Sequence, residues 1–165
     1  MKKLVQYVFT VFAAGILFTS CGSSKQATSN YSKEAISDAI NKNEWVYTAN
    51  FVMPQSGRSR NVNGTYTVNY SNNKFVVYLP YFGQAFSAQI GDSRGPLDFQ
   101  TADFDISKNE KKEGQWEIVL KPKDYREVQS MNFTLYDNGS GDLSVTLTSR
   151  TPISFRGTVA PKINK

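Results

Sequence analysis

The chain contains no histidine and only one cysteine, Cys21, in 165 residues. Without histidine, neither a Ser-His-Asp nor a Cys-His nucleophile can be assembled. Zinc sites of the Cys/His type need about four such ligands, so they are excluded too. A single cysteine cannot form a disulfide within the chain. We therefore expect a protein that is not an enzyme, with no catalytic residues, no metal site and no cofactor.

The chain also has little excess charge. The formal net charge is +5, and it falls to +3 when Lys2 and Lys3 leave with the leader described below. Positive charge this small and this scattered gives no electrostatic footprint for nucleic acid. No nucleic-acid partner is expected.

Aromatic residues, by contrast, are abundant at 13% of the chain, and β-branched residues are frequent. This composition favours strands over helices. The length leaves room for one domain.

Residues 1–20 have the pattern of a secretory signal peptide. Lys2 and Lys3 supply a positive start, and the apolar stretch that follows runs to Phe18 with few interruptions. This stretch is too short to be interpreted as a membrane-spanning helix. We expect the leader to be removed, so that the mature chain begins at Cys21.

The end of the leader, Phe18-Thr19-Ser20-Cys21, resembles the lipobox of bacterial lipoproteins. Phe18 stands where that family usually has leucine, but it keeps the apolar character of the position. The resemblance implies cleavage before Cys21, lipidation of Cys21 and a lipid bilayer as the partner of the anchor. More than one acyl chain makes such an anchor stable. The alternative is an ordinary signal peptide in which the cysteine has no role.

Residues 21–31 carry the acyl anchor and form a polar, flexible tether. Some Gram-negative lipoproteins have an acidic run just after the cysteine when they are displayed on the cell surface. No Asp or Glu occurs between Cys21 and Lys33. By that resemblance we place the protein in the cell envelope, on the periplasmic face of the outer membrane.

Residues 32–165 are predicted to form a single β-rich domain. It opens with one short helix, for which Ser32 is a suitable N-cap and Glu34 suits the positive end of the dipole. From Trp45 onward the apolar residues follow the period of half-buried strands. The expected strands are 45–53, 66–70, 75–79, 85–90, 97–106, 116–120, 131–135, 143–147 and 153–159. About nine strands at hairpin-like spacing predict a mainly β fold, an antiparallel meander forming a barrel-like or two-sheet sandwich domain.

Two of the connections have clear sequence signals. Asn72-Asn73 can supply the two positive-φ residues of a tight hairpin between 66–70 and 75–79. The run 108–114 is rich in charge and ends in glycine, which predicts a turn.

Two stretches, Tyr78–Phe86 and Arg150–Gly157, resemble an uncharacterised family of lipoprotein-type domains from gut-associated Gram-negative bacteria. The order of elements is similar as well, so the resemblance covers roughly residues 32–160. The family is described as a domain of unknown function. The resemblance therefore implies membership and the fold, and it carries over no catalytic residues.

The first of these stretches supplies candidate ligand-binding residues. Pro80 ends a strand, Gly83 permits a turn, and Tyr81, Phe82 and Phe86 lie where the chain leaves the sheet. One interpretation is that these aromatics fill the end of the barrel as core. The other is that they line the mouth of a ligand pocket.

The second stretch supplies Arg150, at the end of one strand and just before Pro152. It is predicted to pair with a carboxylate such as Asp103 or Asp105 as a structural contact. The alternative is that it binds an anionic ligand group bidentately.

Two functional hypotheses follow from these residues. The first is a membrane-anchored, non-enzymatic module that binds a small apolar or anionic ligand or an envelope protein. The second is a carboxylate-based hydrolase of envelope glycan that uses Asp98, Asp103 or Asp105. The loop arginines Arg58, Arg60 and Arg94 are interpreted as solvated, and a basic rim facing anionic lipid or glycan is the alternative.

Overall fold

In the computed structural model, residues 30–63, 65–86 and 95–162 are described. They contain one helix, α2 (Lys33–Lys42), and ten strands. The strands are β1 (Trp45–Pro54), β2 (Arg60–Asn61), β3 (Thr67–Ser71), β4 (Lys74–Tyr78), β5 (Asp98–Thr101), β6 (Phe104–Lys112), β7 (Gln115–Pro122), β8 (Val128–Tyr136), β9 (Ser140–Leu147) and β10 (Ile153–Pro161). Cys21, Arg94 and most of the strand expected at 85–90 lie outside the described residues.

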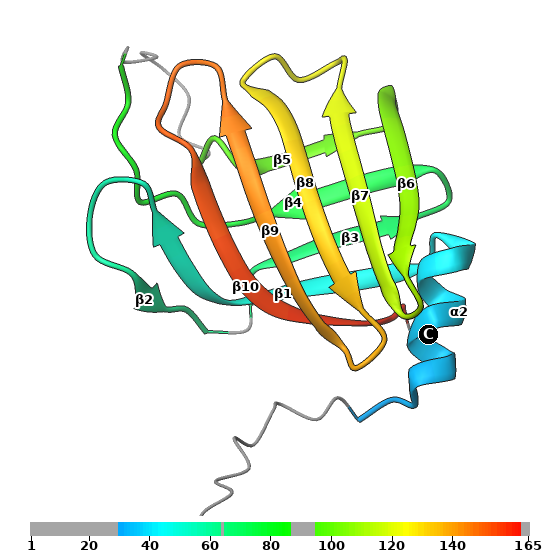
Figure 1. Ribbon diagram of the computed structural model, residues 1–165. Helices are drawn as coiled ribbons and strands as arrows, with labels where there is room; N and C mark the ends of the chain where they lie inside the picture. Colours follow the sequence, from blue (N-terminus) through cyan, green and yellow to red (C-terminus); the bar gives the residue numbers. More distant parts are fainter. Residues whose placement is uncertain (1–29, 64, 87–94, 163–165) are drawn as a thin grey trace, which may run out of the picture.

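All the strands belong to one antiparallel sheet in the order β5-β4-β3-β1-β10-β9-β8-β7-β6, with β2 pairing with β1. Neighbours in the sheet are consecutive in the chain, except that β1 pairs with β3 past the short β2 and that β10 returns to pair with β1. In Figure 1, β6 to β10 form one layer, and β3, β4 and β5 cross behind it. The result is a nearly closed meander barrel whose open seam lies between β5 and β6. This confirms the mainly β meander with one short helix.

The interior of the barrel is filled by packed aromatic side chains. Trp45 is fully buried, and its ring meets those of Phe133, Tyr70 and Phe75 at centroid distances of 5.3, 5.8 and 6.0 Å. Phe104 of β6 lies edge-on to Phe75 of β4, with ring centroids 5.1 Å apart, so this contact spans the seam. Side chains therefore close the barrel where backbone pairing does not.

A close approach of β1 and β10 depends on two glycines. Gly157 of β10 pairs with Ala49 of β1 and with Gly141 of β9. A Cβ at Gly157 would overlap the carbonyl oxygen of Thr48 and would contact the ring of Tyr47, which also covers Gly141. The two small residues thus make room for the buried Tyr47 ring.

Helix α2 begins at the predicted cap, where Ser32 Oγ accepts a hydrogen bond from the backbone N–H of Ala35 at 3.2 Å. Its apolar side packs on the barrel, with Ile36 and Ile40 fully buried. Lys108 of β6 caps the other end by donating to the carbonyl oxygens of Ile40 and Asn41 at 3.1 and 2.9 Å. This strand lysine therefore attaches the helix to the edge of the seam.

No helix in the described part of the chain is long and apolar enough to cross a membrane.

Two predicted boundaries were wrong. The strand expected at 97–106 is broken at Ala102 and Asp103, where the chain turns the corner between β5 and β6. The charged turn expected at 108–114 is reduced to Glu113 and Gly114, because β6 continues to Lys112. Strand β6 pairs only with β7 and is largely exposed, so charged residues there face water on an edge strand.

Candidate functional site

The two stretches that carry the family resemblance lie against each other. Ala85 forms an antiparallel bridge with Arg150. On either side of it, the N–H of Phe86 donates to the carbonyl oxygen of Ser149 at 2.8 Å, and that of Thr151 donates to Gln84 at 3.0 Å. The chain after β4 is thus attached to the loop between β9 and β10.

Tyr81 fixes this attachment through its hydroxyl group. The oxygen lies 2.9 Å from the carbonyl oxygen of Thr151, 3.1 Å from its Oγ1 and 3.1 Å from the carbonyl oxygen of Gln84. Its ring is half-buried and packs on the core. A Cβ at Gly83 would overlap the Tyr81 hydroxyl, so the turn requires glycine. Of the three candidate aromatic residues, Tyr81 packs on the core, as the first interpretation expected.

Arg150 is held by a carboxylate that the sequence did not indicate. Its Nε lies 3.0 Å from Oε1 of Glu127, and Ser149 Oγ donates to the two oxygens of the same carboxylate at 2.7 and 2.9 Å. The side chains of Arg150 and Glu127 are only 21% and 10% exposed. This is a half-buried ion pair with one further polar partner, the Ser149 hydroxyl, and such charge-assisted contacts hold a guanidinium in place.

The predicted partners of Arg150 were therefore wrong. Asp105 instead pairs with Lys123 at 2.6 Å, and Asp103 is exposed. Asp103 and Asp105 lie around the start of β6. Glu127 comes just before β8, and its carbonyl oxygen accepts a hydrogen bond from the N–H of Thr148, just after β9. Strand pairing of β8 with β9 thus brings Glu127 to Arg150.

Two arginines lie over aromatic rings at this end of the barrel. The guanidinium of Arg150 is 5.5 Å from the ring centroid of Tyr81, and that of Arg60 is 4.5 Å from that of Phe82. Arg60 belongs to β2, which pairs with β1. Cation–π contacts of this kind orient the cation without consuming its hydrogen-bond donors.

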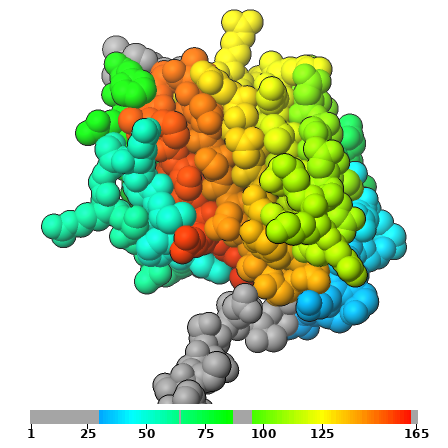
Figure 2. Space-filling model, in the orientation of Figure 1, coloured from blue at the N-terminus to red at the C-terminus, as the bar shows by residue number. Residues whose placement is uncertain are grey.

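Phe82 and Phe86 do not fill the barrel. They are 38% and 72% exposed, and Tyr78 in the same stretch is 46% exposed. Among the described residues, one other large hydrophobic side chain, Ile106, is comparably exposed. Figure 2 shows the segment around residues 78–86, in bright green, standing out at the upper left beside the orange-red loop between β9 and β10. Core packing thus applies to Tyr81 and not to Phe82.

We call these five residues the aromatic–arginine patch: Arg60, Tyr81, Phe82, Phe86 and Arg150. The sequence indicated four of them, and it placed Arg60 in a solvated loop. The sequence could not identify Arg60 as a site residue, because its partner Phe82 is 22 positions away along the chain. Glu127 gave no sequence signal either, since it lies in a charged segment typical of any surface loop.

The carboxylates of the hydrolase hypothesis do not form a site around this patch. Asp103 and Asp105 are exposed, and Asp105 is occupied by Lys123. Asp98 is half-buried and lies on β5, paired in register with Tyr78. The arrangement needed for glycoside cleavage, two carboxylates facing each other across a groove, is not formed by these three residues.

The fold is a nearly closed antiparallel meander with one short helix, and its two motif stretches are joined at one end. These features define the class of domain. The chain belongs to the DUF4251 family, a domain of unknown function whose family model matches residues 27–159. A crystal structure of a DUF4251 family protein from Bacteroides eggerthii has a similar fold. It superimposes with a TM-score of 0.55 at 15% sequence identity, over 78% of this chain and 87% of that chain. No curated protein sequence matches the chain.

Proposed function

We propose that this protein is a non-enzymatic, lipid-anchored binding module of the bacterial envelope, and that its aromatic–arginine patch contacts a protein partner. One observation carries the proposal. Three of the four exposed large hydrophobic side chains among the described residues lie in the stretch 78–86, and two arginines lie over aromatic rings there. Exposed large hydrophobic side chains that gather in one segment are a feature of interaction sites.

The chemistry of the patch matches protein interfaces. Aromatic residues and arginine are enriched at interfaces and supply most of the binding energy. Arg150 is already held by Glu127 through its Nε, at 3.0 Å, so little conformational entropy is lost when its terminal nitrogens bind an acceptor. The expected partner surface presents carboxylates beside apolar side chains.

A protein partner is favoured over a small ligand inside the barrel because the interior is occupied. Trp45 is buried there and packs against the buried rings of Phe75 and Phe133. Phe82 and Phe86 face outward, where a second macromolecular surface can cover them. Exposed side chains on the outer surface suit contact with a partner's surface, whereas small molecules are usually enclosed in concave sites.

The placement of the chain ends supports an anchored module. In Figure 1, the described chain enters beside α2 at the lower end, and the segment around residues 78–86 lies at the upper left. A lipid on Cys21 would attach the α2 end of the domain to the membrane through the tether, and the patch lies at the other end of the barrel. We propose the periplasmic face of the outer membrane, because no acidic residue follows Cys21 before Glu34.

The anchor is tested separately from the patch. Cells grown with labelled palmitate should label the wild-type chain and leave Cys21→Ser unlabelled. Unlabelled wild-type protein would contradict the anchor. Protease added to intact cells should leave the domain uncut, and release of the domain would contradict the periplasmic placement.

The patch is tested by chemical crosslinking in intact cells followed by purification of the protein. The double variant Phe82→Ser/Phe86→Ser should lose a crosslinked species that wild type retains. Ile106→Ser, which removes another exposed hydrophobic side chain on β6, is the matched control and should retain it. Equal recovery from all three proteins would contradict a partner at the patch.

A further inference from the structure

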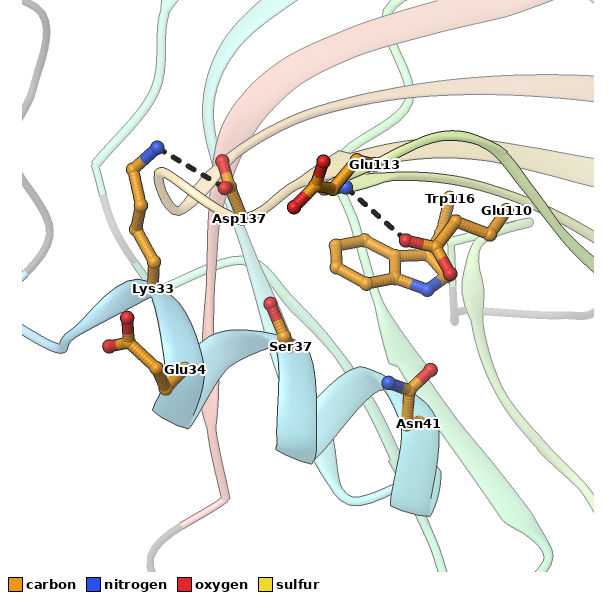
Figure 3. Close-up of a pocket in the computed structure, with 9 residues that line it drawn as sticks. Lys33, Glu34, Ser37, Asn41, Glu110, Glu113, Trp116 and Asp137 are labelled. Atoms are coloured by element: carbon orange, nitrogen blue, oxygen red, sulfur yellow. Dashed lines mark hydrogen bonds and ion pairs between the residues drawn. The ribbon is translucent and has the colours of Figure 1, made fainter.

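A groove with a volume of about 430 Å³ lies at the α2 end of the barrel, away from the aromatic–arginine patch. One side of α2 forms its floor, the tip of the β6–β7 hairpin forms one wall, and the turn between β8 and β9 contributes Asp137. Figure 3 shows the side chains of Ser37 and Asn41 directed from the helix toward the hairpin. The volume is in the range of small-molecule sites.

The groove is strongly acidic. Glu34, Glu110, Glu113 and Asp137 line it, against one cation, Lys33. Lys33 pairs with Asp137 at 3.2 Å. None of the other three carboxylates has an ion-pair partner within the described ranges, although Glu110 Oε1 accepts the N–H of Gly114 at 3.2 Å. The groove therefore has an unbalanced negative charge that a cation would neutralise.

A second, independent feature of the groove is an unused hydrogen-bond donor. Trp116 lines the groove and is 3% exposed, and its Nε1 has no hydrogen-bond partner in the described structure. In Figure 3 its indole lies between the hairpin carboxylates and α2, with the nitrogen on the edge that faces the helix. A buried donor without an acceptor is unfavourable, and native proteins rarely leave one. An acceptor atom supplied by a ligand would satisfy it.

These two features together select the class of ligand. Within the described part of the chain, no three carboxylates converge closely enough to hold a metal ion. An organic ammonium group needs only one or two carboxylates as hydrogen-bond acceptors, so it suits this groove better than a metal ion does. A simple diamine has no oxygen for the Trp116 N–H, whereas a hydroxyl oxygen accepts from nitrogen and also donates to carboxylates.

We propose that this groove binds a small hydroxylated amine, such as an amino sugar with a free ammonium group. The ammonium group pairs with the hairpin carboxylates Glu110 and Glu113, and a hydroxyl oxygen of the ligand accepts the hydrogen bond from Trp116 Nε1. This site is independent of the aromatic–arginine patch, at the opposite end of the barrel.

Nuclear magnetic resonance tests the proposal directly because the chain has two tryptophans, Trp45 and Trp116. The two indole N–H signals of the labelled protein are assigned with Trp116→Phe. Glucosamine should shift the Trp116 signal in a saturable titration and leave the signal of the buried Trp45 in place. N-acetylglucosamine, which lacks the charge, and putrescine, which lacks the oxygen, should each bind at least about tenfold more weakly, since each loses a charge-assisted or neutral hydrogen bond.

Variants connect the signal to the groove. Glu113→Gln should weaken glucosamine binding by about tenfold, the usual effect of one charge-assisted contact. Asp38→Asn removes an equal charge from α2 outside the groove, where Asp38 pairs with Lys42, and should bind like wild type. The proposal is overturned if glucosamine leaves the Trp116 signal unchanged, if N-acetylglucosamine binds equally well, or if the two variants weaken binding equally. If putrescine matches glucosamine, the role of Trp116 as a donor is overturned.

Discussion

The hydroxyl oxygen of Tyr81 lies 2.9 Å from the carbonyl oxygen of Thr151, and this contact joins residues 70 positions apart in the chain. The two stretches that mark the family are therefore one structural unit. Tyr81 and Thr151 hold the backbone in place, and Phe82 and Phe86 are presented to solvent on it. The same stretch thus contains residues that fix the fold and residues that are free to bind.

Tyr81→Phe should destabilise the domain. The variant keeps the ring but removes the hydroxyl that contacts Gln84 and Thr151, so the free energy of unfolding should fall by about 1–2 kcal/mol. Urea unfolding followed by circular dichroism measures it. Tyr78→Phe, at an exposed position in the same stretch, is the control and should change stability by less than about 0.5 kcal/mol. Equal effects would show that the Tyr81 hydroxyl does not fix the loop.

Glu127 and Arg150 should be energetically coupled. Glu127→Ala leaves the half-buried Arg150 and the Ser149 hydroxyl without their acceptor, so it should cost about 1–3 kcal/mol. A double-mutant cycle with Arg150→Ala should give a coupling energy of at least about 0.5 kcal/mol. Simple addition of the two single effects would mean that the pair contributes nothing as a pair.

Gly157→Ala should be among the most damaging single changes in the sheet. The added Cβ would overlap the backbone of Thr48 in β1, and backbone cannot move aside as a flexible side chain can. We expect a loss of at least about 3 kcal/mol or failure to fold. Gly95→Ala has open space around the new Cβ and is the control. Near-native thermal stability of Gly157→Ala would contradict the close approach of β1 and β10.

Lys108→Met should loosen α2 from the barrel. Lys108 donates to carbonyl oxygens at the end of the helix and to Asn43 Oδ1 at 2.9 Å, and methionine keeps the apolar stem without the donors. The expected cost is about 1–2 kcal/mol, with faster amide hydrogen exchange in α2. Lys112→Met, exposed on the same strand, should change neither quantity. Unchanged amide hydrogen exchange in Lys108→Met would show that this lysine does not hold α2 on the barrel.

Local signals in the sequence were sufficient for the helix and for most of the strands. Ser32 caps the helix as expected, and Asn72 and Asn73 have the positive φ of 50° and 54° that their hairpin requires. The break between β5 and β6 also had a signal, because buried positions fall on odd residues through Thr101 and the next aromatic, Phe104, is even. A change of phase in an alternating pattern indicates that the strand does not continue.

The sequence could not reveal contacts that depend on closure of the sheet. The pairing of β1 with β10 joins the two ends of the domain, and no local property of either strand specifies it. Glu127 is one of 14 acidic residues, and only the pairing of β8 with β9 selects it as the partner of Arg150. Long-range partners are chosen by topology, whereas caps and turns are chosen by neighbouring residues.

The central claim, that the aromatic–arginine patch is a protein-binding surface, is tested most directly by site-specific photocrosslinking in living cells. A photoreactive phenylalanine analogue replaces Phe82 or Phe86 in separate strains, and Ile106 in a third. The account predicts one adduct of the same mass from both patch positions and none from position 106. The adduct should weaken when Arg150 is replaced by glutamine. Adducts of equal yield from all three positions, or none from the patch, would contradict it.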